Sequence, residues 1–100
     1  MKGCKMKRCV KIRVIGKVQA VGYRHFIQNQ AEKLMIEGTI QNQHDGSVII
    51  FVCGGQDKLD DLLDFIYQGS PKSKVDDVLI EPMQTERDFR GVFRVIGDNL

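Results

Sequence analysis

The 100-residue sequence lacks the features that mark several classes of protein. It has only 2 prolines and 10 glycines, while 42% of its residues are hydrophobic, which excludes a disordered chain because enough apolar surface is present to offset chain entropy. No apolar stretch approaches the ~18 residues of a membrane-spanning helix, and none follows the basic start as it would in a signal peptide. We therefore predict one compact cytoplasmic domain with no membrane partner.

The cysteines and histidines lack the spacing of a metal site. Cys4, Cys9 and Cys53 form no CxxC pair, so free thiols are expected, with a bridge between Cys4 and Cys9 or between chains as the alternative under oxidation. His25 and His44 have no carboxylate at ligand spacing, and we expect neither a metal nor any other cofactor.

Neither sign of charge is in large excess, but the basic residues are unevenly distributed along the chain. The formal net charge is +2, and six Lys and Arg residues fall within the first 13 positions. We predict that residues 1–8 form a mobile basic arm and that residues 9–100 form the domain. Such an arm favours an anionic partner without identifying it.

The first half of the domain predicts a strand and then a helix. Apolar and basic residues alternate from Cys9 to Ile15, the period of a strand with one covered face that ends near Gly16. Tyr23 and the apolar residues at 27, 31 and 34 then recur at helical spacing, and Gly38 is expected to cap this helix.

The second half predicts a hairpin, a helix and two further strands. Residues 39–42 and 47–52 are β-rich runs joined by a turn with Asp45-Gly46, a strong signal for an antiparallel hairpin. Gly54-Gly55 should break the second run. The remaining predictions are an amphipathic helix that ends at Gly69, a strand from Val75 to Pro82 and a short strand over 93–96.

This order, β-α-β-β-α-β with a short fifth strand, predicts an α+β ferredoxin-like fold. We expect an antiparallel sheet with both helices on one face. The architecture carries many unrelated functions, so the function must be argued from a site.

The segment from Gly16 to Arg24 predicts an anion-binding site. It combines a glycine-flanked turn with the beginning of a helix, where unpaired N–H groups and the helix dipole favour a phosphate. Arg24 can offer two parallel hydrogen bonds to phosphate oxygens, which lysine cannot. The alternative is an arginine solvated on a helix surface.

Gly16 to Arg24 closely resembles the signature of the acylphosphatase family. The segments 38–42, 45–48 and 69–75 also resemble that family in order and spacing, so the resemblance covers roughly residues 8 to 96. It implies an acylphosphatase enzyme, a hydrolase that splits acyl phosphates into a carboxylate and inorganic phosphate without a metal. The implied partner is a small-molecule acyl phosphate, and a monomer is expected.

The resemblance also implies roles for particular residues. Arg24 matches the family's phosphate-binding arginine, and Asn42 matches the asparagine that positions the attacking water. The phosphate cradle is expected to be the backbone N–H groups of Gln19, Ala20, Val21, Gly22 and Tyr23. In a split βαβ fold we expect the strand of Asn42 to lie beside the first strand, so that Asn42 faces the turn after Ile15.

Two positions depart from the family pattern. Ala20 replaces a usual glycine, and a positive φ there would cost ~1–2 kcal/mol, whereas a negative φ would tolerate the methyl group. Thr39 replaces a typical aromatic residue, with an expected effect on packing or on a substrate-side wall.

Two other functions compete with acyl phosphate hydrolysis. The alternative hypothesis for the same site is a domain of this fold that binds phosphate or an acyl phosphate with little or no catalysis. A sheet that binds RNA would need stacking aromatics on its central strands. We predict no nucleic acid partner, because Phe51 is the one aromatic residue of the predicted third strand and the basic residues are expected to lie off the sheet.

Overall fold

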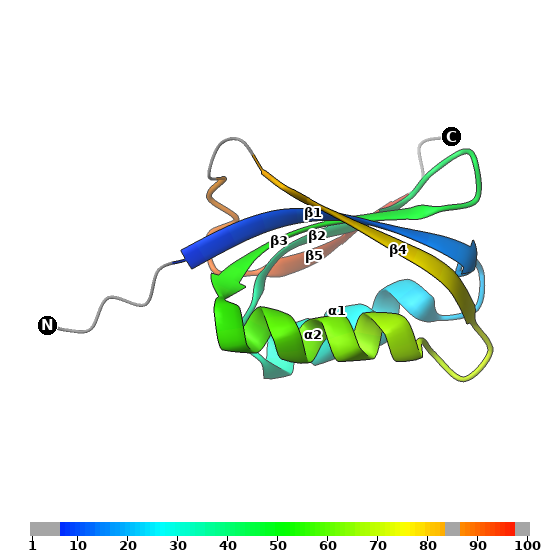
Figure 1. Cartoon of the computed structure of the whole chain (residues 1–100), viewed down its shortest axis with the longest axis horizontal. Helices are drawn as coiled ribbons and strands as arrows, with labels where there is room; N and C mark the ends of the chain where they lie inside the picture. The colour runs from blue at the N-terminus through cyan, green and yellow to red at the C-terminus, as the bar shows by residue number, and fades with distance from the viewer. Residues whose placement is uncertain (1–6, 84–86, 98–100) are drawn as a thin grey trace, which may run out of the picture.

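The computed structural model describes residues 7–83 and 87–97. Figure 1 shows a sheet with two helices packed side by side on one of its faces, as predicted. Neither helix is long and apolar enough to cross a membrane, as judged over the described residues. The elements follow the order β1 (Lys7–Lys17), α1 (Tyr23–Lys33), β2 (Glu37–Asn42), β3 (Val48–Gly55), α2 (Gln56–Gln68), β4 (Lys74–Pro82) and β5 (Phe93–Ile96).

The five strands form one sheet in the order β4-β1-β3-β2-β5. The pairs β1–β3, β1–β4 and β2–β3 are antiparallel, and β2–β3 is the predicted hairpin. β5 pairs with β2 in parallel, so the expectation of a wholly antiparallel sheet is wrong at this edge. The order of strands along the chain does not fix the direction in which a short edge strand docks.

The core lies between the sheet and the helices. Val10, Ile12 and Val14 of β1 face the helices and are at most 8% exposed, which confirms the alternation seen in the sequence. They pack with the buried faces of both helices, which include Tyr23, Ile27, Ala31, Leu59, Leu62 and Ile66.

The first helix ends earlier than its apolar period suggests. It ends at Lys33 with Leu34 as C-cap, and Met35 turns the chain with a φ of 58°. Gly38 lies inside β2, so its prediction as a helix cap is wrong. A Cβ on Gly38 would collide with the carbonyl oxygen of Phe51, so the glycine permits close approach of β2 and β3.

Gly54 and Gly55 extend the third strand, whereas the sequence pattern predicted that they would break it. They pair with Arg8 and Lys7 of β1. β1 therefore begins inside the predicted basic arm and supplies backbone partners to both glycines. The rest of that arm lies outside the described residues.

Cys9 and Cys53 form a disulfide, so the prediction of free thiols is wrong for this pair. The two residues lie directly opposite each other on β1 and β3, with their Cα atoms 4.1 Å apart, which is within bonding reach for a cross-strand pair. Their separation of 44 residues gives no hint of this register in the sequence. Cys4 lies outside the described residues.

Candidate active site

The turn between β1 and α1 has the geometry of an anion-binding nest. Val18 is 1% exposed and fixes the beginning of the turn to the core. Ala20 and Gly22 have φ angles of 59° and 76°, and alternation of left-handed residues with their neighbours turns successive N–H groups toward one point. Of the two conformations that the sequence left open for Ala20, the structure has the strained one.

The N–H groups of this turn are available to a ligand. The backbone nitrogens from Gln19 to Tyr23 donate no hydrogen bond to any residue that the structure describes. Gly22 caps α1 without a side-chain hydrogen bond, and the first turn of the helix carries no acidic residue. Unpaired donors at the positive end of a helix dipole favour an anion such as a phosphate.

Two side chains that the sequence did not single out hold the turn in place. The Gln19 amide nitrogen donates to the carbonyl oxygens of Gln43 and Ser47, at 2.7 and 2.9 Å. The buried Ser70 hydroxyl donates to the carbonyl oxygen of Val21 at 3.1 Å. Ser70 lies in the segment 69–75, which resembles the family in sequence, and this resemblance was the one sequence signal that could have indicated its role.

Arg24 lies in the first turn of α1, as predicted, and is partly buried. Its guanidinium Nη1 donates to the carbonyl oxygen of Ile96 at 2.8 Å. Ile96 pairs with Gln41 on β2, the residue before Asn42. The arginine is therefore held next to the end of β2 by a strand that is remote in sequence.

Asn42 is the last residue of β2. Its strand is not the neighbour of β1, which corrects the expected layout: Val14 and Asn42 both pair with Val48 of β3, so they lie two strand spacings apart, roughly 10 Å. Asn42 approaches the nest because Gln19 bonds to the next residue, Gln43.

The side-chain oxygen of Asn42 is buried and has no hydrogen-bond partner among the residues that the structure describes. A buried acceptor without a partner is costly in a folded protein and points to a functional role. The nest, Arg24 and Asn42 thus converge at one end of the sheet, where a bound phosphate and a water could meet.

The other titratable candidates stay outside this site. His25 and His44 are both exposed, and no cluster of three potential metal ligands occurs in the described parts of the chain. Burial raises the pKa of Tyr23, so its hydroxyl stays protonated and donates to the carbonyl oxygen of Ile66 at 2.8 Å. Tyr23 therefore contributes its backbone and its packing.

The hairpin beside Asn42 is held by a small polar cluster. The hydroxyl and backbone N–H of Ser47, followed by the Arg13 guanidinium, hold the pKa of Asp45 below its usual range. Asp45 accepts from both Ser47 groups, at 2.6 and 2.9 Å, and from Arg13 at 3.0 Å. This cluster fixes the turn that joins β2 to β3.

Comparison with known proteins identifies the family. The family model for acylphosphatase matches residues 10–95. The chain belongs to the acylphosphatase family. It is 41% identical over 85 residues to the acylphosphatase of Caldivirga maquilingensis, covering 82% of this chain and 90% of that one. It is 44% identical over 71 residues to the acylphosphatase of Bacillus licheniformis, covering 71% and 79%.

A solved acylphosphatase has the same fold. The crystal structure of acylphosphatase from Bacillus subtilis matches with a TM-score of 0.85 at 32% identity and covers 92% of this chain and 100% of that one. The resemblance that the sequence suggested is confirmed by these matches. Membership of the acylphosphatase family makes the chain an enzyme that hydrolyses acyl phosphates.

Proposed function

We propose that the chain hydrolyses acyl phosphates by binding the phosphoryl group in the nest from Gln19 to Tyr23 under Arg24, while Asn42 positions the attacking water. The observation that supports this most directly is the convergence of unpaired backbone donors with a buried, unpaired Asn42 oxygen. We further propose that residues 9–100 belong to one acylphosphatase domain, which also includes the two residues that begin β1, Lys7 and Arg8.

The nest and Arg24 act by electrostatic stabilisation. The N–H groups of the turn and the first turn of α1 point at the phosphoryl oxygens, whose charge changes as the bond to the carboxylate breaks. The hydrogen bond to Ile96 holds the guanidinium beside the end of β2, and the planar fork of an arginine matches the geometry of phosphoryl oxygens.

Asn42 orients the nucleophile, which is a water molecule. Its side-chain oxygen accepts a hydrogen bond from a water that lies in line with the carboxylate leaving group. The water oxygen bonds to phosphorus, the bond from phosphorus to the acyl oxygen breaks, and the carboxylate leaves with the electron pair. The water proton passes to a phosphoryl oxygen, so the products are a carboxylate and inorganic phosphate.

The proposed reaction needs no metal, cofactor or covalent intermediate. A carboxylate is a good leaving group, so positioning and charge stabilisation suffice. We further propose that the enzyme works as a monomer in the cytoplasm, with a small-molecule acyl phosphate as substrate.

The test is hydrolysis of an aromatic acyl phosphate by the purified chain in the presence of a chelator. We expect turnover without added metal, and a loss of ~10²–10³ in kcat for Arg24→Ala, the scale of one oxyanion donor. Arg24→Lys keeps the charge and loses the fork, so it should recover only part of this activity. Asn42→Ala should lower kcat with little effect on phosphate affinity.

Matched controls come from the exposed side of the same helix. His25→Ala and Asn29→Ala alter exposed residues of α1 and should leave kcat unchanged. A folded wild-type chain that binds phosphate but gives no turnover would favour the phosphate-binding alternative. Full activity in folded Arg24→Ala or Asn42→Ala would remove the proposed role of that residue.

A further inference from the structure

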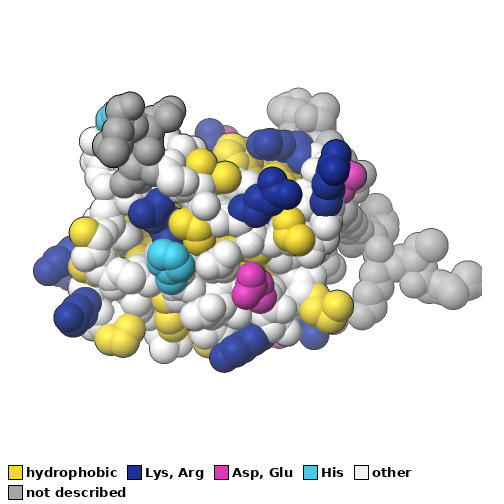
Figure 2. Space-filling view, turned by 180° about the vertical axis from the view of Figure 1, so that it is seen from behind, with side chains coloured by type: hydrophobic (Ala, Val, Ile, Leu, Met, Phe, Trp, Pro, Cys, Tyr) yellow, Lys and Arg dark blue, Asp and Glu magenta, His cyan; other side chains and the backbone are white. Residues whose placement is uncertain are grey.

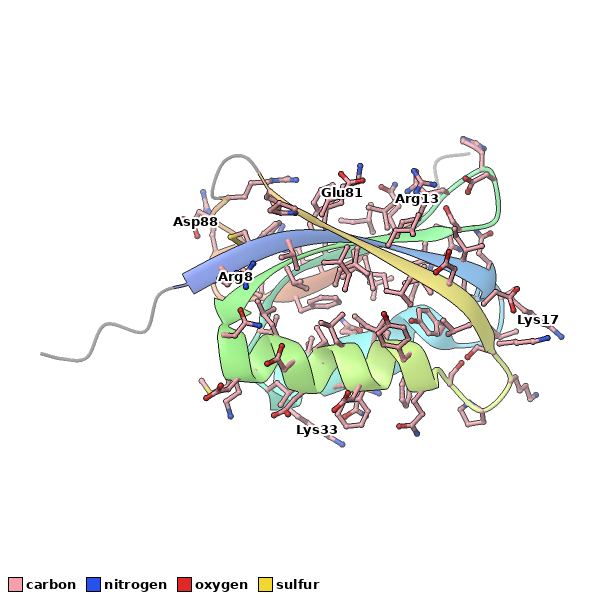
Figure 3. All side chains as sticks on the ribbon, viewed as in Figure 1. Arg8, Arg13, Lys17, Lys33, Glu81 and Asp88 are labelled. Atoms are coloured by element: carbon pink, nitrogen blue, oxygen red, sulfur yellow. A yellow bond between two sulfur atoms is a disulfide. The ribbon has the colours of Figure 1, made fainter. Side chains whose placement is uncertain are left out.

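The face of the sheet opposite the helices carries a second polar surface. Lys11 and Arg13 of β1 alternate with the core residues of that strand, so they point to this open face. They were expected to lie off the sheet, and that expectation is wrong for these two residues. Figure 3 shows Arg13 and Glu81 on this side, and Lys33 beyond the helices on the other side.

Two adjoining hollows run across this face from β1 to β5. One has a volume of about 230 Å³ and is lined by Lys11, Arg13, Gln41 and Phe51 among others. The other has a volume of about 460 Å³ and is lined mainly by the segment 87–90, Arg94 and Ile96. Thr39 lines both, so the hollows meet over β2.

Positive charge dominates the lining of the two hollows. Among the described residues, five cationic side chains line them, with Asp88 as the one carboxylate. Asp45 already pairs with Arg13, so the charge available to a ligand comes from the other four. These are Lys11, Arg87, Arg90 and Arg94. The acidic Glu81 lies on the edge strand β4, opposite Lys11 in register.

Figure 2 shows several Lys and Arg side chains along the upper, sheet side of the molecule, and others at the left and lower edges of the view. The cations are dispersed over the sheet and do not form one tight cage. From β1 to β5 there are three strand spacings, roughly 14 Å. This spread suits an extended anion with successive charges better than a single phosphate.

Between these charges, two apolar side chains contribute to a mainly polar lining. Phe51 and Ile49 of the central strand β3 line the first hollow. The Arg87 guanidinium carbon lies 5.2 Å from the ring centre of Phe51 and 5.1 Å from that of Phe89, so two aromatic rings support this side chain. A planar base can stack on such a supported guanidinium or on an aromatic ring.

We propose that this open face binds single-stranded nucleic acid, with Lys11, Arg90 and Arg94 on phosphates and with a base stacked beside the Arg87 guanidinium. The combination of spaced cations with a guanidinium that contacts two aromatic rings favours this ligand, since a purely inorganic polyanion would use only the cations. The side chains of Thr39 and Gln41 lie between the charges and can bond to base edges.

The test is fluorescence anisotropy of labelled 12-nucleotide oligo(dT) and oligo(rU) with the full chain at low salt. The double variant Lys11→Glu/Arg94→Glu should weaken binding at least 10-fold and make the salt dependence shallower by about 1.4 in slope, 0.7 for each phosphate contact on a single strand. Both residues lie outside the proposed catalytic site, and hydrolysis of an acyl phosphate checks that the variant is folded.

The matched control is Lys33→Glu/Lys58→Glu, which makes the same change in net charge on exposed residues of the two helices. It should retain wild-type affinity. An equal loss of oligonucleotide affinity in both double variants would overturn the proposal, because binding would then depend on the net charge of the protein and not on this face.

Absence of binding at low salt, or displacement of the oligonucleotide by orthophosphate at the concentration that inhibits hydrolysis, would also overturn it. The latter result would place the oligonucleotide in the phosphate nest. Inorganic tripolyphosphate binding as tightly as the oligonucleotide would remove the role of the bases.

Discussion

Ala20 adopts a backbone conformation that L-residues rarely hold. Its φ of 59° lies in the left-handed region, which costs roughly 1–2 kcal/mol for a residue with a side chain. The conformation is retained because it turns the N–H groups of the nest together. Strain at a binding site, maintained by the surrounding structure, is a common arrangement in enzymes.

Ala20→Gly should therefore stabilise the protein. Relief of strain exceeds the added chain entropy of glycine, ~0.5–1 kcal/mol, so we expect a gain of up to about 1 kcal/mol in the free energy of unfolding, measured by denaturant titration. Met35→Gly is the matched variant, because Met35 has a φ of 58° and is 90% exposed away from the nest. Stabilisation by Met35→Gly without any from Ala20→Gly would show that φ at position 20 is not strained.

Local sequence patterns predict the position of a residue within its element, but they do not predict contacts that depend on strand register. Arg24 was found because it follows a glycine-flanked turn, and the structure places it in the first turn of α1. The bond from Arg24 to Ile96 spans 72 residues, and no local pattern contains it. The same holds for Cys9 and Cys53, which meet through the pairing of β1 with β3.

The connection between the nest and the β2–β3 hairpin depends on one side chain. Gln19 donates two hydrogen bonds to hairpin carbonyl oxygens, and the hairpin follows Asn42 directly. Gln19→Glu keeps the shape and replaces the donor by a carboxylate, which repels both carbonyls. We expect a fall in kcat of ~10-fold, because small displacements of a positioned nucleophile are costly.

Steady-state kinetics and denaturant titration together test this prediction. Gln19→Ala should have a smaller effect than Gln19→Glu, since it removes the donor without adding a charge. Gln30→Glu on α1 makes the same chemical change away from the nest and should leave kcat intact. Equal kcat in Gln19→Glu and the wild type would show that the connection does not position Asn42.

The hairpin turn is also the element whose stability should respond to acid. The pKa of Asp45 is lowered in the folded state by Ser47 and Arg13, so its contribution is present above the unfolded pKa of about 3.9 and is lost as the pH falls through the folded value. The stability difference between wild type and Asp45→Asn should therefore be larger at pH 6 than at pH 2.

Thermal unfolding at both pH values provides the measurement. Asp64→Asn is the matched control, because Asp64 is exposed on α2 and makes no contact of this kind with a described residue. A difference between wild type and Asp45→Asn that does not change with pH would mean that the cluster around Asp45 carries no net charge stabilisation.

At the scale of the whole molecule, the disulfide and the proposed catalytic site lie at opposite ends of the strands. The elements of the site meet where β2 ends, at Asn42, whereas the disulfide joins β1 and β3 opposite Glu37, where β2 begins. Five residues of strand separate these positions, roughly 17 Å. The covalent link can therefore change without disturbing the proposed catalytic groups.

Reduction of the disulfide should lower stability and leave activity at 25 °C intact. A link across 44 residues stabilises by about 4 kcal/mol in the chain-entropy account, a large share of the ~5–15 kcal/mol of a typical domain. We expect wild-type protein to lose stability in reductant, whereas Cys9→Ala/Cys53→Ala should be less stable at the outset and indifferent to reductant. When unreduced protein is treated with a thiol-alkylating reagent, mass measurement should find both cysteines unmodified. Alkylation of both cysteines in unreduced protein would contradict the link. Equal stability of the wild type with and without reductant would also contradict it.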